Sequence, residues 1–301
     1  MRGNLQVSAR IERRLPIGAE VRADGTHFRV WAPRHAHVDV VLETGGATPL
    51  SRSADGYFEG LVTDASAGTR YRFQLGGGTM VPDPASRFQP DGPHGWSEVI
   101  DPGTFRWSDV GWRGAPRKSQ VVYEMHIGTF TRAGTWAAAT ELLPALADVG
   151  VTLLEVMPAA DFPGRFGWGY DGVNLFAPTR LYGRPDDFRA FVDRAHAVGL
   201  GVILDVVYNH LGPDGNYLRE FSDGYFTDRY ATPWGDSLHF DGDGSGPVRE
   251  YYLVNAAHWI DEYHLDGLRL DATHTVHDAS EEHILAAVAR VVRERAGGRR
   301  T

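Results

Sequence analysis

The sequence predicts a protein of two parts, an antiparallel β-sandwich followed by an α/β part built on a parallel sheet. Up to residue 97, short β-rich runs are separated by Gly, Pro, Asp and Ser, a pattern typical of antiparallel sandwiches. From residue 120 onward, apolar strand-like runs alternate with amphipathic helical stripes, a pattern typical of parallel sheets covered by helices. With 301 residues, the chain is long enough for two domains or for one full α/β barrel.

The first part contains predicted strands at intervals of roughly ten residues or a little more. They lie at residues 27–31, 37–42, 57–62 and 71–75. We place the sandwich at residues 1–97. A linker that bears Trp, Pro and Arg follows at residues 98–119.

The second part, residues 120–301, is predicted to contain four strands that alternate with four helices. The strands lie at residues 121–125, 151–157, 200–207 and 267–270; the helices lie at 136–149, from Pro185 to Gly199, at 255–263 and up to about Glu294. Asn255 is the predicted N-cap of the third helix, and Asp278 or Ser280 that of the last. Pro144 should kink the first helix or mark its real boundary. Because the strands are mostly apolar, we expect a parallel sheet buried on both faces.

Composition and charge argue against several classes of partner. The net charge is −9, so an acidic surface should repel nucleic acid and anionic membranes, whereas a neutral substrate such as a sugar is compatible with it. The chain has no cysteine, which excludes disulfides and cysteine-ligated metals. Residues 1–16 contain several Arg and no apolar run, and no stretch of about 18 apolar residues exists. We therefore expect no signal peptide, no membrane span and a cytoplasmic location.

Three polar clusters lie at or beyond the ends of successive predicted strands, at residues 168–171, 205–210 and 267–274. Since the carboxyl ends of parallel strands meet at one edge of a sheet, these clusters should converge. Strand alternation places Arg269 and Asp271 on the same side. Ionisable groups at buried strand ends are costly unless they pair or function.

Each cluster taken alone has a simpler interpretation. An Arg-x-Asp pair is more often a structural salt bridge than a catalytic pair. An Asn-His pair after a strand is usually a turn with a satisfied imidazole, and a Trp-Gly-Tyr segment is usually a packed loop. The occurrence of all three in one α/β pattern favours a functional site.

Two of these segments resemble signature regions of the α-amylase family of glycoside hydrolases. Residues 205–210 resemble the first region, and residues 267–274 resemble the region that contains the nucleophile. Residues 15–76 resemble the immunoglobulin-like N-terminal module of branching and debranching members. The resemblance implies an immunoglobulin-like β-sandwich followed by the first half of a TIM (β/α)8 barrel, truncated after its fourth βα unit.

The resemblance also implies a role for each candidate residue. Asp271 would attack the anomeric carbon and Arg269 would hold it ionised, in a retaining mechanism with two carboxylates about 5–5.5 Å apart. The remaining residues would bind substrate: Asp205 by fixing Arg269, His210 and His274 by hydrogen bonds to sugar, Tyr170 by stacking, and Trp168 by lining the same loop. No cofactor is expected. Because Asn209 alone does not make an oxygen cage, no metal is predicted.

Further segments at residues 153–158, 162–164, 168–173 and 208–217 resemble one member of this family, and this resemblance implies a substrate. It is maltooligosyltrehalose or another α-glucan, with cleavage of the α-1,4 bond next to the terminal trehalose and release of trehalose. Branching or debranching of α-glucans is the nearest alternative, and a non-catalytic glucan-binding protein is the other. The sequence makes no prediction of oligomeric state.

The family's general acid is a glutamate at the end of a fifth barrel strand. The last predicted helix ends near Glu294 and only a short basic tail follows, so we expect that strand to lie beyond Thr301 and the chain to be a fragment. Glu281 and Glu282 would sit in the solvated first turn of that helix. A chain without the acid should turn over poorly, because positioned proton transfer is worth about 10²–10⁴-fold in rate.

Overall fold

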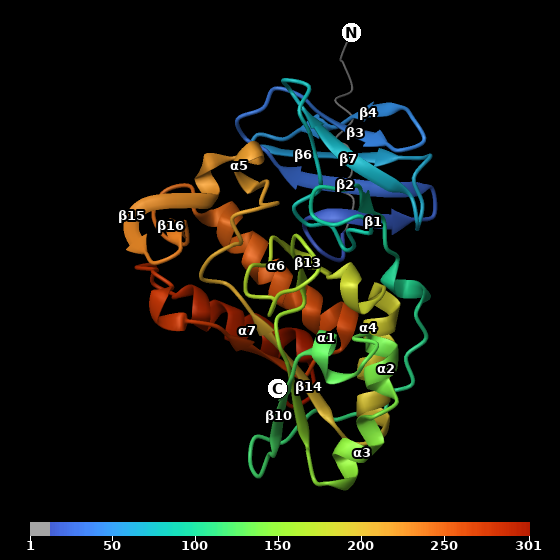
Figure 1. Cartoon of the computed structure of the whole chain (residues 1–301). Coiled ribbons are helices and arrows are strands. Elements are labelled where there is room, and N and C mark those ends of the chain that lie inside the picture. Colours follow the sequence, from blue (N-terminus) through green and yellow to red (C-terminus); the bar gives the residue numbers. More distant parts are fainter. Residues whose placement is uncertain (1–12) are drawn as a thin grey trace.

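The computed structural model describes residues 13–301 (Figure 1). An all-β part, blue in Figure 1, lies at one end of the molecule, and the α/β part makes up the rest. The predictions made for residues 1–12, including most of the segment tested for a signal peptide, lie outside the described residues.

The all-β part consists of two antiparallel sheets, with strand orders β1-β2-β6-β5 and β4-β3-β7-β8, and with β9 also paired to β7. The first sheet is formed by β1 Gly18–Arg22, β2 Gly25–Trp31, β6 Tyr57–Val62 and β5 Ser51–Arg52. The second is formed by β4 Ala47–Pro49, β3 Val38–Leu42, β7 Arg70–Leu75, β8 Met80–Val81 and β9 Ser97–Glu98.

The two sheets pack through alternating apolar side chains. In β7, Tyr71, Phe73 and Leu75 are buried while the residues between them are partly exposed. The Phe28 ring of β2 lies 4.7 Å from Tyr71 and 6.4 Å from Phe73, centroid to centroid, so the core is formed between the sheets. The four predicted strands of this part are found as β2, β3, β6 and β7, and the sequence missed the shorter strands around them.

The α/β part is organised around a parallel sheet in the order β10-β11-β14-β17. Its strands are β10 Val122–Met125, β11 Leu153–Val156, β14 Gly201–Val206 and β17 Gly267–Leu270. Each pair is parallel, and all four strands agree with the predicted ones to within two residues. Two hairpins interrupt the alternation: β12 Ala160–Asp161 with β13 Asn174–Pro178, and β15 Phe226–Thr232 with β16 Gly235–Leu238.

Helices connect these strands. Three of the four residues of β10 are exposed, so the predicted burial of the sheet on both faces is wrong for this strand. The α-helices are α1 Ile127–Phe130, α2 Trp136–Thr140, α3 Leu143–Asp148, α4 Pro185–Ala197, α5 Leu218–Phe221, α6 Gly246–Tyr263 and α7 Ile284–Ala296. Short 3₁₀ turns are η1 Pro102–Thr104, η2 Arg180–Tyr182, η3 Asp223–Tyr225 and η4 Thr273–Thr275. Within the described part of the chain, none of these helices combines the length and the apolar character needed to cross a lipid bilayer.

Three helix predictions need correction or refinement. The predicted helix at 136–149 is divided into α2 and α3. Pro144 lies in the first turn of α3, where its missing N–H costs no hydrogen bond, so it marks a helix boundary as predicted. Asn255 is not an N-cap, because α6 begins at Gly246 and Asn255 lies buried in its interior.

The last helix begins later than predicted, at Ile284. His283 is its N-cap, and the predicted caps Asp278 and Ser280 lie before the helix. The Asp278 carboxylate nevertheless accepts a hydrogen bond from the Ile284 amide at 2.5 Å. Glu281 and Glu282 therefore precede the helix and do not form its first turn, and Glu282 pairs with Arg290 at 2.9 Å.

A cluster of two histidines and two aspartates, in which all but His264 have buried side chains, joins the linker to the α/β part. Asp109 of the linker lies 2.9 Å from His196 Nδ1 and 2.8 Å from His264 Nδ1. Asp266, just before β17, lies 3.1 Å from His196 Nε2 and accepts a 2.7 Å hydrogen bond from the Trp112 indole. Because both nitrogens of His196 face carboxylates, the protonated imidazole, which can donate twice, fits the cluster best.

The charges of this cluster shift its protonation. Burial alone would lower the pKa of His196, but its hydrogen bonds to Asp109 and Asp266 outweigh burial and raise the pKa. Burial would likewise raise the pKa of Asp109, but the hydrogen bonds from His196 and His264 hold it well below its usual range.

Replacing His196 should therefore destabilise the protein in a pH-dependent way. The stability that comes from His196 is fully present below its ordinary pKa of 6.5 and is lost as pH rises through its raised folded-state value. The contribution of Asp109 is present above 3.8 and is lost as pH falls through its lowered value, so both act together between pH 3.8 and 6.5. In urea unfolding within this range, His196→Gln should cost about 2 kcal/mol. At a pH of about 9 the loss should be smaller.

The exposed His37 offers a matched control, and His37→Gln should leave the unfolding free energy nearly unchanged at either pH. An equal loss for His196→Gln at both pH values would contradict the charged form of the cluster.

Candidate active site

The structure brings three of the predicted site residues together at the carboxyl ends of β14 and β17. Asp205 and Arg269 are direct neighbours across these two strands. Asp271 follows β17 immediately, and its amide donates a 3.1 Å hydrogen bond to the carbonyl of Val206 in β14. The parallel register thus aligns one cation with two carboxylates from adjacent strand ends.

Arg269 is the centre of this group. Its Nη1 donates hydrogen bonds to both oxygens of Asp205, at 3.0 and 2.8 Å, and to Oδ1 of Asp271 at 2.7 Å. The predicted placement of Arg269 and Asp271 on the same side is confirmed. Burial would lower the pKa of Arg269, but the bonds to the two carboxylates outweigh it and raise the pKa. Arg269 therefore stays charged, and the cation offsets the repulsion between its partners.

Asp205 is the buried partner, with 1% of its surface exposed. Besides Arg269, it accepts a 2.8 Å hydrogen bond from the hydroxyl of Tyr170, which comes from the loop after β11. Burial raises the pKa of Asp205, and the donors on Tyr170 and Arg269 partly offset this. The Asp271 side chain is more accessible, at 20%, so it is the carboxylate of the pair that a ligand can reach.

The loop that presents Tyr170 depends on a glycine beside it. Gly169 has a φ of +90°, and a Cβ at this position would lie 2.0 Å from the carbonyl oxygen of Pro158. No other residue fits this close approach without moving the backbone. The turn places the Tyr170 hydroxyl within reach of Asp205.

His210 lies at the edge of the group in a largely buried position. Its ring stacks on Trp234, with centroids 4.9 Å apart and planes inclined by 13°. Burial lowers the pKa of His210, which favours the neutral imidazole at pH 7. The sequence did not single out Trp234, which comes from the β15–β16 hairpin.

The other two predicted residues lie apart from the acidic group. His274 is exposed on η4. Trp168 is 75% exposed and lines an open cleft together with Phe166, His126 and Tyr182. Both occupy loops that follow the same strand ends, but neither contacts Asp205, Arg269 or Asp271 through a hydrogen bond or ring contact among residues 13–301.

Sequence reasoning also missed Glu155 of β11. Its Oε1 lies 3.9 Å from Nε of Arg269, so the guanidinium faces a third carboxylate. Burial, together with the nearby charges of Glu124 and Asp205, raises the pKa of Glu155. A charged residue inside an otherwise apolar strand was the feature that could have identified it.

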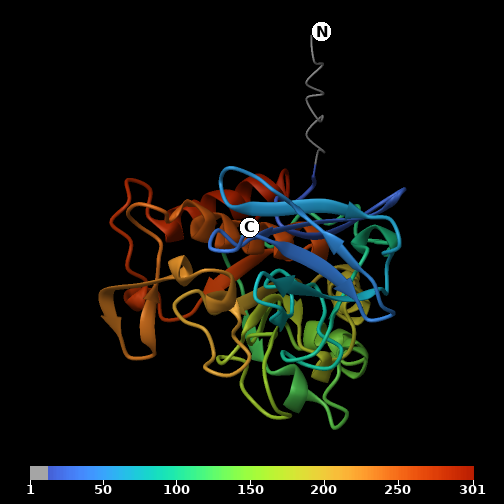
Figure 2. The ribbon, with the colours of Figure 1, turned by 90° about the horizontal axis from the view of Figure 1, so that it is seen from above.

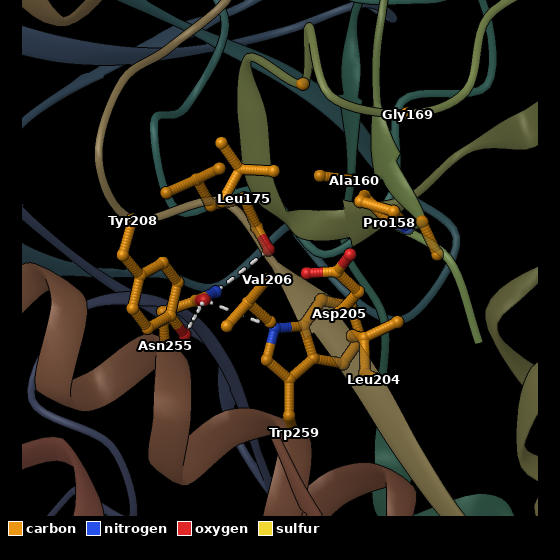
Figure 3. A pocket seen from close by; sticks show the side chains of 13 residues that line it. Pro158, Ala160, Gly169, Leu175, Leu204, Asp205, Val206, Tyr208, Asn255 and Trp259 are labelled. Atoms are coloured by element: carbon orange, nitrogen blue, oxygen red, sulfur yellow. Dashed lines mark hydrogen bonds between the residues drawn. The ribbon is translucent and has the colours of Figure 1, made fainter. Parts of the chain in front are cut away.

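A buried hydrogen-bond network joins α6 to the segment that follows β14 (Figure 3). A small pocket lies beside Asp205, and Asn255 and Trp259 of α6 form part of its wall. Asn255 accepts hydrogen bonds from the Tyr208 hydroxyl at 2.6 Å and from the Trp259 indole at 3.2 Å, and it donates to the carbonyl of Leu175 at 2.8 Å. Since Tyr208 lies two residues after the end of β14, this network holds the chain between Asp205 and His210.

Chemically, the arrangement offers an accessible carboxylate that is hydrogen-bonded to a permanent cation, with an aromatic ring and a neutral imidazole nearby. Such a carboxylate suits nucleophilic attack on an electrophilic carbon. In the described part of the chain, no three His, Asp or Glu side chains gather in a way that could hold a metal ion.

Family models match both parts of the chain. The model of the α-amylase catalytic domain matches residues 86–236, and that of carbohydrate-binding module 48, the isoamylase N-terminal domain, matches residues 16–102.

Curated relatives match nearly the whole chain. The malto-oligosyltrehalose trehalohydrolase of Saccharolobus solfataricus is 45% identical over 92% of this chain and 49% of its own length. That of Deinococcus radiodurans is 47% identical over 94% of this chain and 45% of its own length. A 1,4-alpha-glucan branching enzyme of Pseudoalteromonas atlantica is 33% identical over 86% of this chain and 39% of its own length. The chain thus spans about half the length of the trehalohydrolases it matches.

Solved structures share the fold. A candidate alpha amylase from Salmonella typhimurium is 46% identical, with a TM-score of 0.90 over 95% of this chain and 48% of that chain. A pullulanase from Paenibacillus barengoltzii, 23% identical with a TM-score of 0.78 over 92% of this chain and 51% of that chain, shows likeness of fold alone.

Removing the Asn255 amide should destabilise the protein more than an ordinary Asn truncation does. Asn255→Ala leaves Tyr208, Trp259 and the Leu175 carbonyl without their buried partner, which should cost about 2–4 kcal/mol in urea unfolding. Asn216→Ala is the control, because within residues 13–301 the Asn216 side chain bonds only to the nearby Leu218 amide. It should cost about 1 kcal/mol or less, and equal losses for the two variants would contradict the role given to Asn255.

Proposed function

The chain belongs to the α-amylase family, and from its acidic group we propose that the protein hydrolyses α-1,4 glucosidic bonds with Asp271 as the nucleophile. The observation that supports this most is the accessible Asp271 carboxylate, held 2.7 Å from Arg269 and backed by the buried Asp205. We propose that the parallel sheet forms the first half of a (β/α)8 barrel, with these residues at its carboxyl end.

In the proposed reaction, an oxygen of Asp271 attacks the anomeric carbon while the bond from that carbon to the leaving oxygen breaks. A carboxyl group acting as acid protonates the leaving oxygen, and water later cleaves the glycosyl ester, so the anomeric configuration is retained. Within this scheme Arg269 keeps Asp271 in place and Asp205 anchors Arg269. We assign the acid to none of the residues 13–301.

The surrounding residues are proposed to bind the sugar. The Tyr170 ring, fixed through its hydroxyl to Asp205, would stack on the apolar face of the pyranose bound at Asp271. His210 and His274 would donate hydrogen bonds to sugar hydroxyls, and Trp168 would line the same groove. His274 and Trp168 must then be reached by a ligand that extends beyond the acidic group.

For substrate, we propose maltooligosyltrehalose, with release of trehalose. The names and the 45–47% identity of the trehalohydrolase relatives support this choice. Action on α-1,6 branches, supported by the more distant branching-enzyme relative, is the second candidate. The domain limits 1–97, 98–119 and 120–301 and a cytoplasmic location are part of the proposal, as is α-glucan binding by the sandwich.

Product analysis separates these candidates. The protein that carries this chain should release free trehalose from maltooligosyltrehalose, measured by chromatography, and should leave the number of α-1,6 branches in glycogen or amylose unchanged. Formation or loss of branches without trehalose release would favour the second candidate.

Substitution of the nucleophile should remove this activity. Asp271→Asn keeps the size and a hydrogen-bond acceptor but lacks the attacking charge, so trehalose release should fall on the order of 10³-fold or more. Asp64→Asn, at an exposed carboxylate of the sandwich, is the matched control and should retain full activity. An Asp271→Asn enzyme with near wild-type turnover would exclude Asp271 as nucleophile.

A further inference from the structure

We infer that the N-terminal sandwich is a positioning part of the candidate active site: it holds the long excursion after β14, residues 211–240, so that Trp234 lies against His210. That the position of Trp234 and His210 matters for sugar binding rests on the proposed function. The inference itself concerns the packing of the two parts. Figure 1 shows α5, which belongs to this excursion, next to the sandwich.

The first anchor is a buried aromatic contact at α5. Phe73 of β7 and Phe221 of α5 are both fully buried, with ring centroids 6.0 Å apart and planes at 88°. Beside them, Arg34 Nη2 donates to the carbonyl of Glu220 at 2.9 Å, and His35 Nε2 lies 2.7 Å from the same oxygen. The sandwich therefore satisfies a carbonyl at the end of a one-turn helix, which such a short helix cannot do itself.

The second anchor is formed by Trp31, the last residue of β2. Its ring lies 5.2 Å from that of Tyr225, at 74°, and Tyr225 is 2% exposed. A Cβ on Gly224 would lie 3.1 Å from Cη2 of Trp31, so the backbone of η3 packs directly on the indole. The contact is close enough that the segment has little freedom to shift.

The third anchor is formed by residues 93 and 94, which lie between β8 and β9 of the sandwich. Nδ1 of His94 lies 2.8 Å from the Tyr217 hydroxyl, and its Nε2 lies 3.1 Å from Oδ1 of Asp214. Gly215, at φ +89°, packs so closely on Pro93 that a Cβ would lie 2.7 Å from that ring. This anchor acts on the segment nearest to His210.

From these anchors the excursion continues to the site. The amide of His239 donates a 3.0 Å hydrogen bond to the carbonyl of Tyr225, which closes the base of the β15–β16 hairpin on the second anchor. At the hairpin tip, Trp234 stacks on His210. At the other end, the Gly212 amide donates to the Gly172 carbonyl at 3.1 Å, which joins the excursion to the loop of Tyr170.

The excursion has few means of holding this shape alone. It contains a one-turn helix, a 3₁₀ turn and a two-stranded hairpin, and isolated elements of this size are marginally stable. Viewed from above, the hairpin, in orange, projects to the side of the sandwich, in blue (Figure 2). Its position therefore depends on where its base is held. The base packs on the sandwich through Trp31 and Tyr225, while Tyr251 of α6 and His277, which stacks on Tyr230, hold it from the α/β part.

Hydrogen–deuterium exchange of the whole chain tests the inference. Phe221→Ala removes the first anchor, so amides at residues 211–217 and 226–238 should exchange faster, on the order of tenfold, while β10, β11 and β17 keep their rates. Phe221→Leu should restore much of the protection. Phe191→Ala truncates an equally buried aromatic of α4 and should leave both segments unchanged.

If Phe221→Ala fails to fold, the double variant Arg34→Ala and His94→Ala, which changes partly exposed side chains, should accelerate the same segments several-fold. Unchanged exchange in the folded variants would overturn the inference. A parallel calorimetric titration with maltooligosaccharide separates it from the proposed function. Faster exchange without sugar binding by the wild type would contradict only the function, whereas binding with unchanged exchange would contradict only the positioning role.

Discussion

The hydrogen bonds of one guanidinium hold the candidate active site together. Arg269 reaches Asp205 on the neighbouring strand at 2.8 Å and Asp271 on its own chain segment at 2.7 Å. The Asp205 and Asp271 carboxylates would otherwise repel each other, and the guanidinium that both contact offsets this repulsion. The parallel register pairs Asp205 with Arg269 directly, so the pairing of β14 with β17 also brings these two site residues together. The Tyr170 loop adds a hydrogen bond to Asp205, and the Asn255 network holds Tyr208 in the segment that follows.

Much of the fold follows from apolar periodicity. The strands β6 and β17 were predicted at their observed limits, because their buried positions are encoded in the local pattern. The short strands β5, β8 and β9 have two residues each, too few for any periodicity, and they exist through pairing with longer neighbours. The prediction of Asn255 as a helix cap was wrong. Asn is common at caps because of its local hydrogen bonds, but here its side chain bonds to the carbonyl of Leu175, which is distant in sequence.

The sequence could predict those site residues whose positions are determined by the ends of the parallel strands. Asp205, Arg269 and Asp271 follow or end parallel strands, and their convergence needs no knowledge of loops. Trp234 could not be found this way, because its stacking on His210 depends on a hairpin whose base packs on the sandwich. The catalytic roles themselves stay predictions, supported by family membership and by geometry.

Covalent trapping tests the central assignment most directly. An α-glucosyl fluoride with a further fluorine on the sugar ring slows hydrolysis of the ester, and fluoride leaves without needing a proton, so the nucleophile is tested independently of any acid. Attack breaks the bond from the anomeric carbon to fluorine and forms an ester with the enzyme. Peptide mass spectrometry should find the fluoroglucosyl group on Asp271. Labelling of Asp205 or Glu155, with Asp271 unmodified, would contradict the account.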